Sequence, residues 1–182
     1  MAKAQQDAIA LLKADHRKVE DLFEKAEKAR DEKRKEALVR EICTELMVHS
    51  TIEEEIFYPA CKGRIDDEDI LDEAYVEHDG AKVLISELLE SAPGSEFYDA
   101  KVKVLAELIK HHVKEEEARS EGLFAQARAA GLDVDELGAR LKHRKQELLA
   151  DFESRVELPP PETRSYTGHK LVQREPLEAP KG

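Results

Sequence analysis

The chain has 182 residues, of which 41% are hydrophobic and 38% charged, with 8 glycines and no tryptophan. This composition favours amphipathic helices over sheets, and the length suffices for one domain with a core. The net charge of −12 argues against nucleic acids and anionic membranes as partners, because binding to phosphate needs a basic surface.

Two segments in the first third of the chain carry histidines on their apolar faces. Apolar residues recur at helical spacing over roughly 4–30, and His16 falls on that stripe. A second helix is predicted over roughly 35–61, where His49 and Glu53 continue the inward stripe. Because these two residues are four apart, their side chains lie on one helix face and can reach a common point.

The middle of the chain predicts two further helices. One runs over roughly 68–91 and carries His78 among its inward apolar residues. Pro93 and Gly94 then interrupt the chain, and a long helix is predicted over roughly 96–130.

The long helix carries a second histidine–glutamate pair at the same spacing. Its inward stripe consists of Leu105, Ile109, His112 and Glu116. An imidazole and a carboxylate therefore replace apolar residues at the centre of the buried face. His111 and Glu115 lie about 100° away, on the rim of the helix, so His112 and Glu116 are the stronger candidates for a buried site.

The last part of the chain changes character. Asp133 and Glu136 match a capping box, which predicts a fifth helix over roughly 134–155. Three prolines at 159–161 cannot continue a helix, and we expect an extended or disordered tail rather than a docking segment. The expected units are a bundle domain over 1–156, with its core at about 4–131 and the extra helix at about 134–155, and a flexible tail over 157–182.

The placement of the histidines predicts a metal site inside an antiparallel, up-down four-helix bundle of the all-α class. A lone histidine on an apolar stripe is usually an ordinary core residue, but buried glutamates are rare unless they are paired or metal-bound. A structural cluster of ion pairs without metal is the alternative. The candidate ligands are His16, His49, Glu53, His78, His112 and Glu116.

The ligand types restrict the metal. Imidazole and carboxylate without thiolate suit iron, manganese or zinc. Six ligands are too many for a single tetrahedral zinc ion, whereas two carboxylates able to bridge suit a pair of metal ions.

At four places the sequence resembles the hemerythrin-like, or HHE cation-binding, domains, and the resemblance covers roughly 7–155. The matching pieces, in chain order, are Asp15-His16-Arg17-Lys18-Val19, His49-Ser50-Thr51-Ile52-Glu53-Glu54-Glu55-Ile56-Phe57-Tyr58-Pro59, Glu77-His78-Asp79 and His111-His112-Val113-Lys114-Glu115-Glu116-Glu117. The resemblance implies an antiparallel four-helix bundle with an oxo- or hydroxo-bridged pair of iron ions. It also implies that the four histidines are terminal ligands, whereas Glu53 and Glu116 bridge the irons.

Two departures from the family pattern affect the expected chemistry. Oxygen-carrying hemerythrins have a second histidine on the third helix, one turn after the first, where this chain has Lys82. Water, His111 or an oxygen ligand such as Tyr75 are the candidates to fill the position of the missing histidine. Its absence disfavours reversible oxygen carriage, and an open position favours reaction with peroxide, oxygen or nitric oxide instead. The second departure lies at 118–125, where the expected aromatic-proline ending is missing; an extra turn with a bulge is predicted in the fourth helix.

Several polar residues near the expected ligands have open roles. Lys82 either extends toward solvent or takes a role near the metals. Glu54, Glu55 and Glu117 are expected to be exposed, although Glu54 is also a candidate to hydrogen-bond a ligand.

The leading functional expectation is a protein with two iron ions that binds or reduces oxygen, hydrogen peroxide or nitric oxide, in oxidative or nitrosative stress or in iron handling. Manganese and zinc suit the same ligands, and the sequence leaves enzymatic turnover open. The alternative is a non-catalytic iron- or redox-sensing module, in which the fifth helix or the tail contacts a protein partner. A structural bundle without metal is the third interpretation.

The remaining signals concern location. Residues 1–7 show no signal peptide pattern, and no segment approaches the about 18 consecutive apolar residues of a membrane span. Two cysteines, Cys43 and Cys61, are too few for a disulfide framework. We therefore expect a soluble, cytoplasmic protein.

Overall fold

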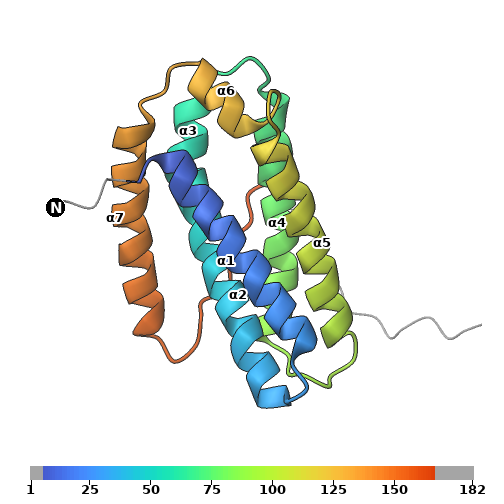
Figure 1. Ribbon diagram of the computed structural model, residues 1–182. Coiled ribbons are helices and arrows are strands. Elements are labelled where there is room, and N and C mark those ends of the chain that lie inside the picture. Colours follow the sequence, from blue (N-terminus) through green and yellow to red (C-terminus); the bar gives the residue numbers. More distant parts are fainter. Residues whose placement is uncertain (1–5, 167–182) are drawn as a thin grey trace, which may run out of the picture.

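The computed structural model describes residues 6–166 and is helical throughout its regular parts (Figure 1). The predicted all-α antiparallel bundle is confirmed: α1, α2 with its continuation, α4 and α5 alternate in direction, and α7 lies along the outside of α1 and α2. The elements are α1 (Ala8–Lys28), α2 (Glu32–Ile52), the π-helical turn η1 (Glu53–Phe57), α3 (Tyr58–Cys61), α4 (Asp69–Leu89), α5 (Tyr98–Glu117), α6 (Leu123–Ala129) and α7 (Val134–Glu153).

Short polar residues and glycines set the helix ends. Asp7, Asp31 and Asp133 each accept a hydrogen bond from the backbone N–H three residues on, at 2.7, 2.8 and 2.9 Å, and so cap α1, α2 and α7. Gly63 and Gly131 follow helix ends with φ of 73° and 68°, a conformation that glycine adopts at little cost.

The second helix of the bundle contains a π-helical turn that the sequence analysis did not predict. The backbone N–H of Tyr58 donates to the carbonyl of Glu53, five residues earlier, and η1 widens the helix there. Pro59 follows at once; it cannot donate to the preceding turn, and its ring conflicts with regular α-helical geometry. The bulge therefore lies in this helix and not in the fourth, where it was expected.

The single helix predicted over 96–130 is wrong, because the chain breaks after α5. The backbone of Ala118 is extended, with ψ of 137°, and Gly122 passes so close to it that an added Cβ would lie 2.6 Å from the Ala118 nitrogen. The chain then turns into α6. This break lets Phe124 pack against Phe57, with ring centroids 5.6 Å apart.

The apolar core has two parts, and the polar candidate residues lie between them. Leu12 and Ile52 belong to the part near α3 and α6, whereas Val19 and Leu46 belong to the part near the other end of the bundle. On α1, His16 falls between Leu12 and Val19 in sequence, so the site sits where the two apolar clusters meet. Within the described residues, no helix is long and apolar enough to cross a membrane.

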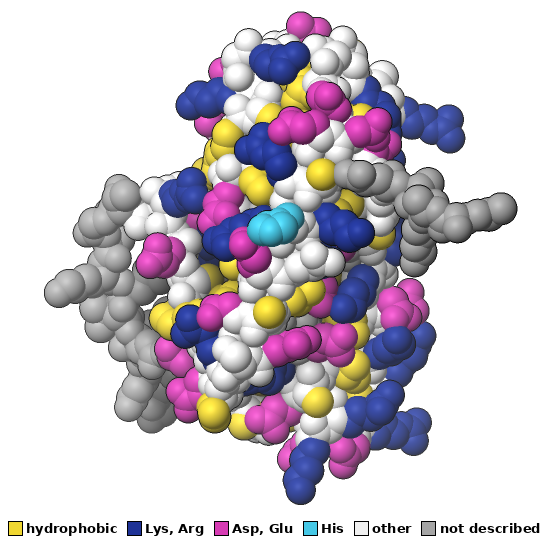
Figure 2. All heavy atoms as spheres, turned by 90° about the vertical axis from the view of Figure 1, so that its left-hand side faces the viewer, with side chains coloured by type: hydrophobic (Ala, Val, Ile, Leu, Met, Phe, Trp, Pro, Cys, Tyr) yellow, Lys and Arg dark blue, Asp and Glu magenta, His cyan; other side chains and the backbone are white. Residues whose placement is uncertain are grey.

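The described part of the tail lies against the bundle, in contrast to the loose tail that we expected. After α7 the chain passes from α2 to α4 (Figure 1): the Val156 carbonyl accepts from the Arg40 guanidinium at 2.9 Å, and the Arg164 backbone N–H donates to Asp79 at 2.8 Å. The expectation for 167–182 lies outside the described residues. The face formed by α7 carries interspersed acidic and basic side chains (Figure 2).

Candidate metal centre

The structure brings all six candidate ligands together in the middle of the bundle. Each is at least 95% buried, and each comes from the inward face that the helical periodicity predicted. Four separate helices supply them, with Glu53 at the first position of the π-helical turn. The residues are His16 on α1, His49 on α2, Glu53 on η1, His78 on α4, and His112 and Glu116 on α5.

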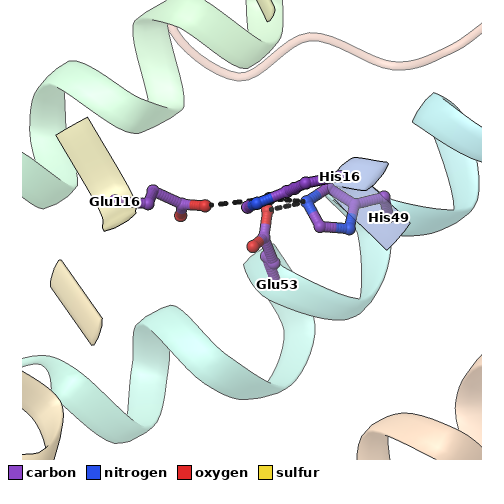
Figure 3. A group of neighbouring side chains, drawn as sticks. All are labelled: His16, His49, Glu53 and Glu116. Carbon is purple, nitrogen blue, oxygen red and sulfur yellow. Dashed lines mark hydrogen bonds and ion pairs between the residues drawn. The ribbon is translucent and has the colours of Figure 1, made fainter. Parts of the chain in front are cut away.

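The four imidazoles form two pairs, with Nε2 atoms facing inward. The Nε2 atoms of His16 and His49 are 3.1 Å apart, and those of His78 and His112 are 3.2 Å apart. The first pair is drawn with both glutamates in Figure 3, where the Glu116 carboxylate points toward His16 from the opposite side of the site.

Each glutamate contacts two histidines, one from each pair. Glu53 Oε2 lies 3.2 Å from Nε2 of His49 and 3.4 Å from Nε2 of His78. Glu116 Oε2 lies 3.3 Å from Nε2 of His16 and 3.5 Å from Nε2 of His112. Two imidazole pairs joined by two carboxylates make a symmetric set of donors.

These donors fit a pair of metal ions. Glu53 Oε1 is buried and has no hydrogen-bond partner among the described residues, and Glu116 Oε2 has only its long contacts with His16 and His112. This arrangement costs free energy unless a cation satisfies the oxygens. His16, His49, Glu53 and Glu116 form one group of ligand atoms within 4.8 Å of one another, and Glu53, His78 and His112 form a second. Because Glu53 belongs to both groups, the two ions would share it.

A second carboxylate faces the outer nitrogen of each candidate ligand histidine, and for three of the four it lies within hydrogen-bonding distance. This arrangement favours the ring proton on Nδ1 and leaves Nε2 free as a metal donor. The Nδ1 partners are Glu117 for His16 at 2.8 Å, Glu54 for His78 at 3.0 Å, Glu77 for His112 at 2.8 Å and, at the longer ion-pair distance of 3.6 Å, Asp15 for His49. Sequence reasoning named only Glu54 for such a role.

The structure decides between the two alternatives given for Glu54 and for Lys82: Glu54 contacts a candidate ligand, and Lys82 lies beside the site. Glu54 is 4% exposed, so its expected exposure was wrong, as was the alternative that Lys82 extends to solvent. The Lys82 ammonium donates to both Glu54 oxygens, at 2.7 and 3.0 Å, and lies 3.4 Å from Asp79. Burial alone would raise the pKa of Glu54, but hydrogen bonds from His78 and Lys82 lower it, which keeps a carboxylate against His78.

The described tail completes this side of the site. Asp79 accepts the Ser165 hydroxyl at 2.6 Å, and Arg164 Nε lies 3.2 Å from Glu54. The tail thus contacts the residue that orients His78.

Tyr58 is a site residue that sequence reasoning missed. Its side chain is buried, and its hydroxyl lies 3.0 Å from Glu116, 3.2 Å from Glu53 and 3.3 Å from His78 Nε2. Burial and the charges of Glu116 and Glu53 raise the pKa of Tyr58 well above its usual value, so the phenol keeps its proton and donates.

His111 and Tyr75, the two residues considered in place of the histidine that is missing at Lys82, do not lie among the candidate ligands. His111 has a side chain 60% exposed and contacts Glu77 and Glu115 at the surface. Tyr75 packs its ring edge-on against that of Tyr58, with centroids 5.3 Å apart.

We predict that Tyr58→Phe destabilises the metal-free protein by about 1–3 kcal/mol, because buried carboxylate oxygens lose their donor. The destabilisation should be smaller in metal-loaded protein, where the cations satisfy the carboxylates. Urea unfolding with and without metal measures both effects, and Tyr75→Phe is the matched control, which should change little. Equal destabilisation in the two metal states would contradict this role for the Tyr58 hydroxyl.

A small cavity of about 20 Å³ adjoins the histidines. Besides them and Lys82, its lining includes the apolar side chains Val19, Leu46, Ala81, Ile85, Ile109 and Val113. A volume of this size holds one water or a molecule of a few atoms, so the site excludes larger organic substrates.

Comparisons with known proteins agree with this geometry. The sequence profile described as "Hemerythrin HHE cation binding domain" matches residues 7–127. A curated relative named DNA nickase, from Nostoc sp., is 28% identical over 118 residues; the match covers 65% of this chain but only 32% of the relative, so the chain spans about a third of that protein's length. A crystal structure of a hemerythrin HHE cation binding domain-containing protein from Mycobacterium kansasii has a TM-score of 0.67 and 22% identity, and the match covers 81% of this chain and 90% of the other.

Proposed function

Because the chain belongs to the hemerythrin HHE cation-binding domain family, we propose that it holds a pair of iron ions and uses them to bind or reduce a small oxidant, namely oxygen, hydrogen peroxide or nitric oxide. The observation that carries the proposal is the contact of both Glu53 and Glu116 with a histidine of each pair. Buried carboxylates between two imidazole pairs suit two cations that share both bridges.

Each part of the site has a role in this proposal. His16 and His49 would hold one ion, His78 and His112 the other, and the two glutamates would bridge them. When bound, an iron pair can supply two electrons to an oxidant and regain them from a reductant; in peroxide decomposition that reductant is a second hydrogen peroxide molecule, which is oxidised to oxygen. The small volume of the cavity admits only small ligands, and the apolar side chains in part of its wall limit entry of water.

The position of Lys82 favours reduction or decomposition over reversible carriage. Lys82 occupies the place of the additional family histidine, and its ammonium is bound to Glu54 and cannot act as a ligand. The pair of His78 and His112 therefore supplies one imidazole fewer than the oxygen-carrying pattern, which leaves a position for an exchangeable ligand. The Tyr58 hydroxyl lies 3.3 Å from His78 Nε2 and holds a proton beside Glu53 and Glu116, the two carboxylates that would bridge the ions.

The test is the metal content of protein purified without chelators, joined to absorption spectra before and after hydrogen peroxide. We expect about two irons per chain, near-ultraviolet bands that respond to peroxide, and sustained peroxide consumption. Protein that holds no metal, or a single zinc ion, would refute the proposal.

A second candidate function is a metal-dependent interaction module, and the packing of the chain's C-terminal elements favours it. Lys145 on α7 pairs with Asp15, which faces His49, and the tail contacts Glu54 and Asp79 beside His78. Loss of metal would loosen both contacts and alter the α7 and tail surface offered to a protein partner. Strong stabilisation by iron without peroxide turnover would favour this function.

We propose no nucleic-acid or membrane partner. The name of the Nostoc relative concerns DNA, but this chain spans only about a third of that protein. The net charge of −12 disfavours a polyanionic partner.

A further inference from the structure

A second cluster of metal-ligand side chains lies at the surface, between α4 and α5. His111 and Glu115 lie four residues apart on α5, with His111 Nε2 3.1 Å from Glu115 Oε1, and Glu77 on the neighbouring α4 lies 3.5 Å from the same nitrogen. One ligand atom from each lies within 4.8 Å of the others. We propose that His111, Glu115 and Glu77 form an outer site for a divalent transition-metal ion, from which the ion passes inward at Glu77.

The donors of this outer site suit such an ion. One imidazole and two carboxylates form the mixed nitrogen and oxygen set that ferrous iron, manganese and zinc accept. Two helices hold the ligands, because the i,i+4 spacing on α5 and the packing of α4 against it fix their approach. The side chains of His111, Glu115 and Glu77 are 60%, 32% and 18% exposed, so an ion can arrive with part of its water shell.

Glu77 connects the outer site to the buried centre. Its Oε1 faces His111, while its Oε2 accepts from Nδ1 of His112 at 2.8 Å. A single carboxylate therefore touches the outer cluster with one oxygen and a proposed ligand of the inner site with the other. An ion held outside would pull on Glu77 and weaken its hold on His112, which frees that ring to turn.

The buried inner centre requires a route by which metal ions can enter it. All six inner ligands are at least 95% buried, so an ion reaches them only when a side chain in the wall moves. Glu77, which contacts His112, is partly exposed to solvent. The net charge of −12 also attracts cations to the surface.

The first experiment titrates zinc chloride into protein whose inner site has been loaded with iron, with binding followed by calorimetry. We expect one additional zinc site, weakened at least about tenfold in His111→Ala, because even the loss of a residue that only supports a ligand typically costs about 10–100-fold in affinity. His143→Ala is the matched control: His143 also precedes a glutamate by four residues, on α7, at 3.6 Å, but Arg144 pairs with that glutamate and no third ligand joins it within the described residues.

The second experiment measures the rate at which ferrous iron becomes resistant to a chelator in metal-free protein. His111→Ala and Glu115→Gln should load several-fold more slowly than the parent and the His143→Ala control, and should reach the same final iron content. Unchanged zinc affinity in His111→Ala, or an unchanged loading rate in both variants, would overturn the proposal.

The loading step rests on the proposed iron pair, whereas outer binding does not. If the parent protein held no iron at the inner site, the proposed function would fail. The zinc titration of metal-free His111→Ala against the parent would still decide whether the outer site exists.

Discussion

Glu53→Ala is expected to reduce the bound iron from about two per chain to less than one, and to abolish peroxide consumption. Glu53 is the ligand shared by the two groups of candidate ligands, and its Oε2 contacts a histidine of each pair. Without it, each ion loses a carboxylate, and two neighbouring dications lose negative charge that offsets their repulsion. Metal analysis by mass spectrometry and a peroxide assay measure the two losses.

The matched control for this variant is Glu55→Ala. Glu55 lies two residues away in the same π-helical turn, but it is exposed and pairs with Arg144 at 2.7 Å. Circular dichroism of both metal-free variants checks that they fold. Full iron content in folded Glu53→Ala would show that Glu53 is not a shared ligand and would leave a single-ion or structural role for the site.

The six candidate ligands were predictable because each depends only on helical periodicity within its own segment. His112 and Glu116 follow Leu105 and Ile109 on one face of α5, and an α-helix fixes that face whatever packs against it. The outer carboxylates were not predictable in the same way. Glu117 meets His16 across a distance of 101 residues in the chain, and only the packing of α5 on α1 brings them together.

Tyr58 was missed for a local reason. In a regular α-helix a residue five positions after Glu53 lies about 140° around the helix from it, and so faces elsewhere. In the π-helical turn the backbone of Tyr58 bonds to that of Glu53, and the two side chains meet. The signal available in the sequence was Pro59, which disfavours a regular helix at this point, but it does not specify the width of the turn.

The break after α5 and the docking of the tail depend on contacts distant in sequence. Gly122 is a weak point in the predicted helix over 96–130, yet a lone glycine is tolerated in many helices. The tail contacts Asp79 through backbone N–H groups of Arg164 and Ser165. Because almost every residue has a backbone N–H group, such contacts cannot be predicted from the pattern of side chains. Composition alone therefore indicated a loose segment there.

The metal-free protein is expected to lose stability as the pH rises from about 6.5 to 9, whereas the metal-loaded protein should keep its stability over that range. Burial alone would lower the pKa values of the buried histidines, but Glu53 and Asp15 raise that of His49 to about 10, and Glu53 and Glu54 raise that of His78 to about 9. The unfolded chain releases these protons near pH 6.5. The stabilisation is therefore complete below about pH 6.5 and is lost as the pH rises through the folded-state values.

The acidic side of the profile has the opposite sign. Burial alone would raise the pKa of Glu53, but His49 and His78 hold it well below its usual value. This stabilisation is present above the unfolded value of about 4.5 and is lost as the pH falls. The contributions of Glu53, His49 and His78 therefore make the metal-free protein most stable between about pH 4.5 and 6.5.

Metal ions remove the alkaline loss of stability because they replace protons on the same nitrogens. Binding should release protons, and the affinity for iron should rise with pH until the histidines are neutral. Urea unfolding of both forms at pH 6, 7, 8 and 9 measures the widening gap between them, and a pH indicator in weak buffer measures the proton release. Metal-free protein that becomes more stable between pH 6.5 and 9 would show that protons are not held by these histidines, and the two carboxylates would then lack the cation that their burial requires.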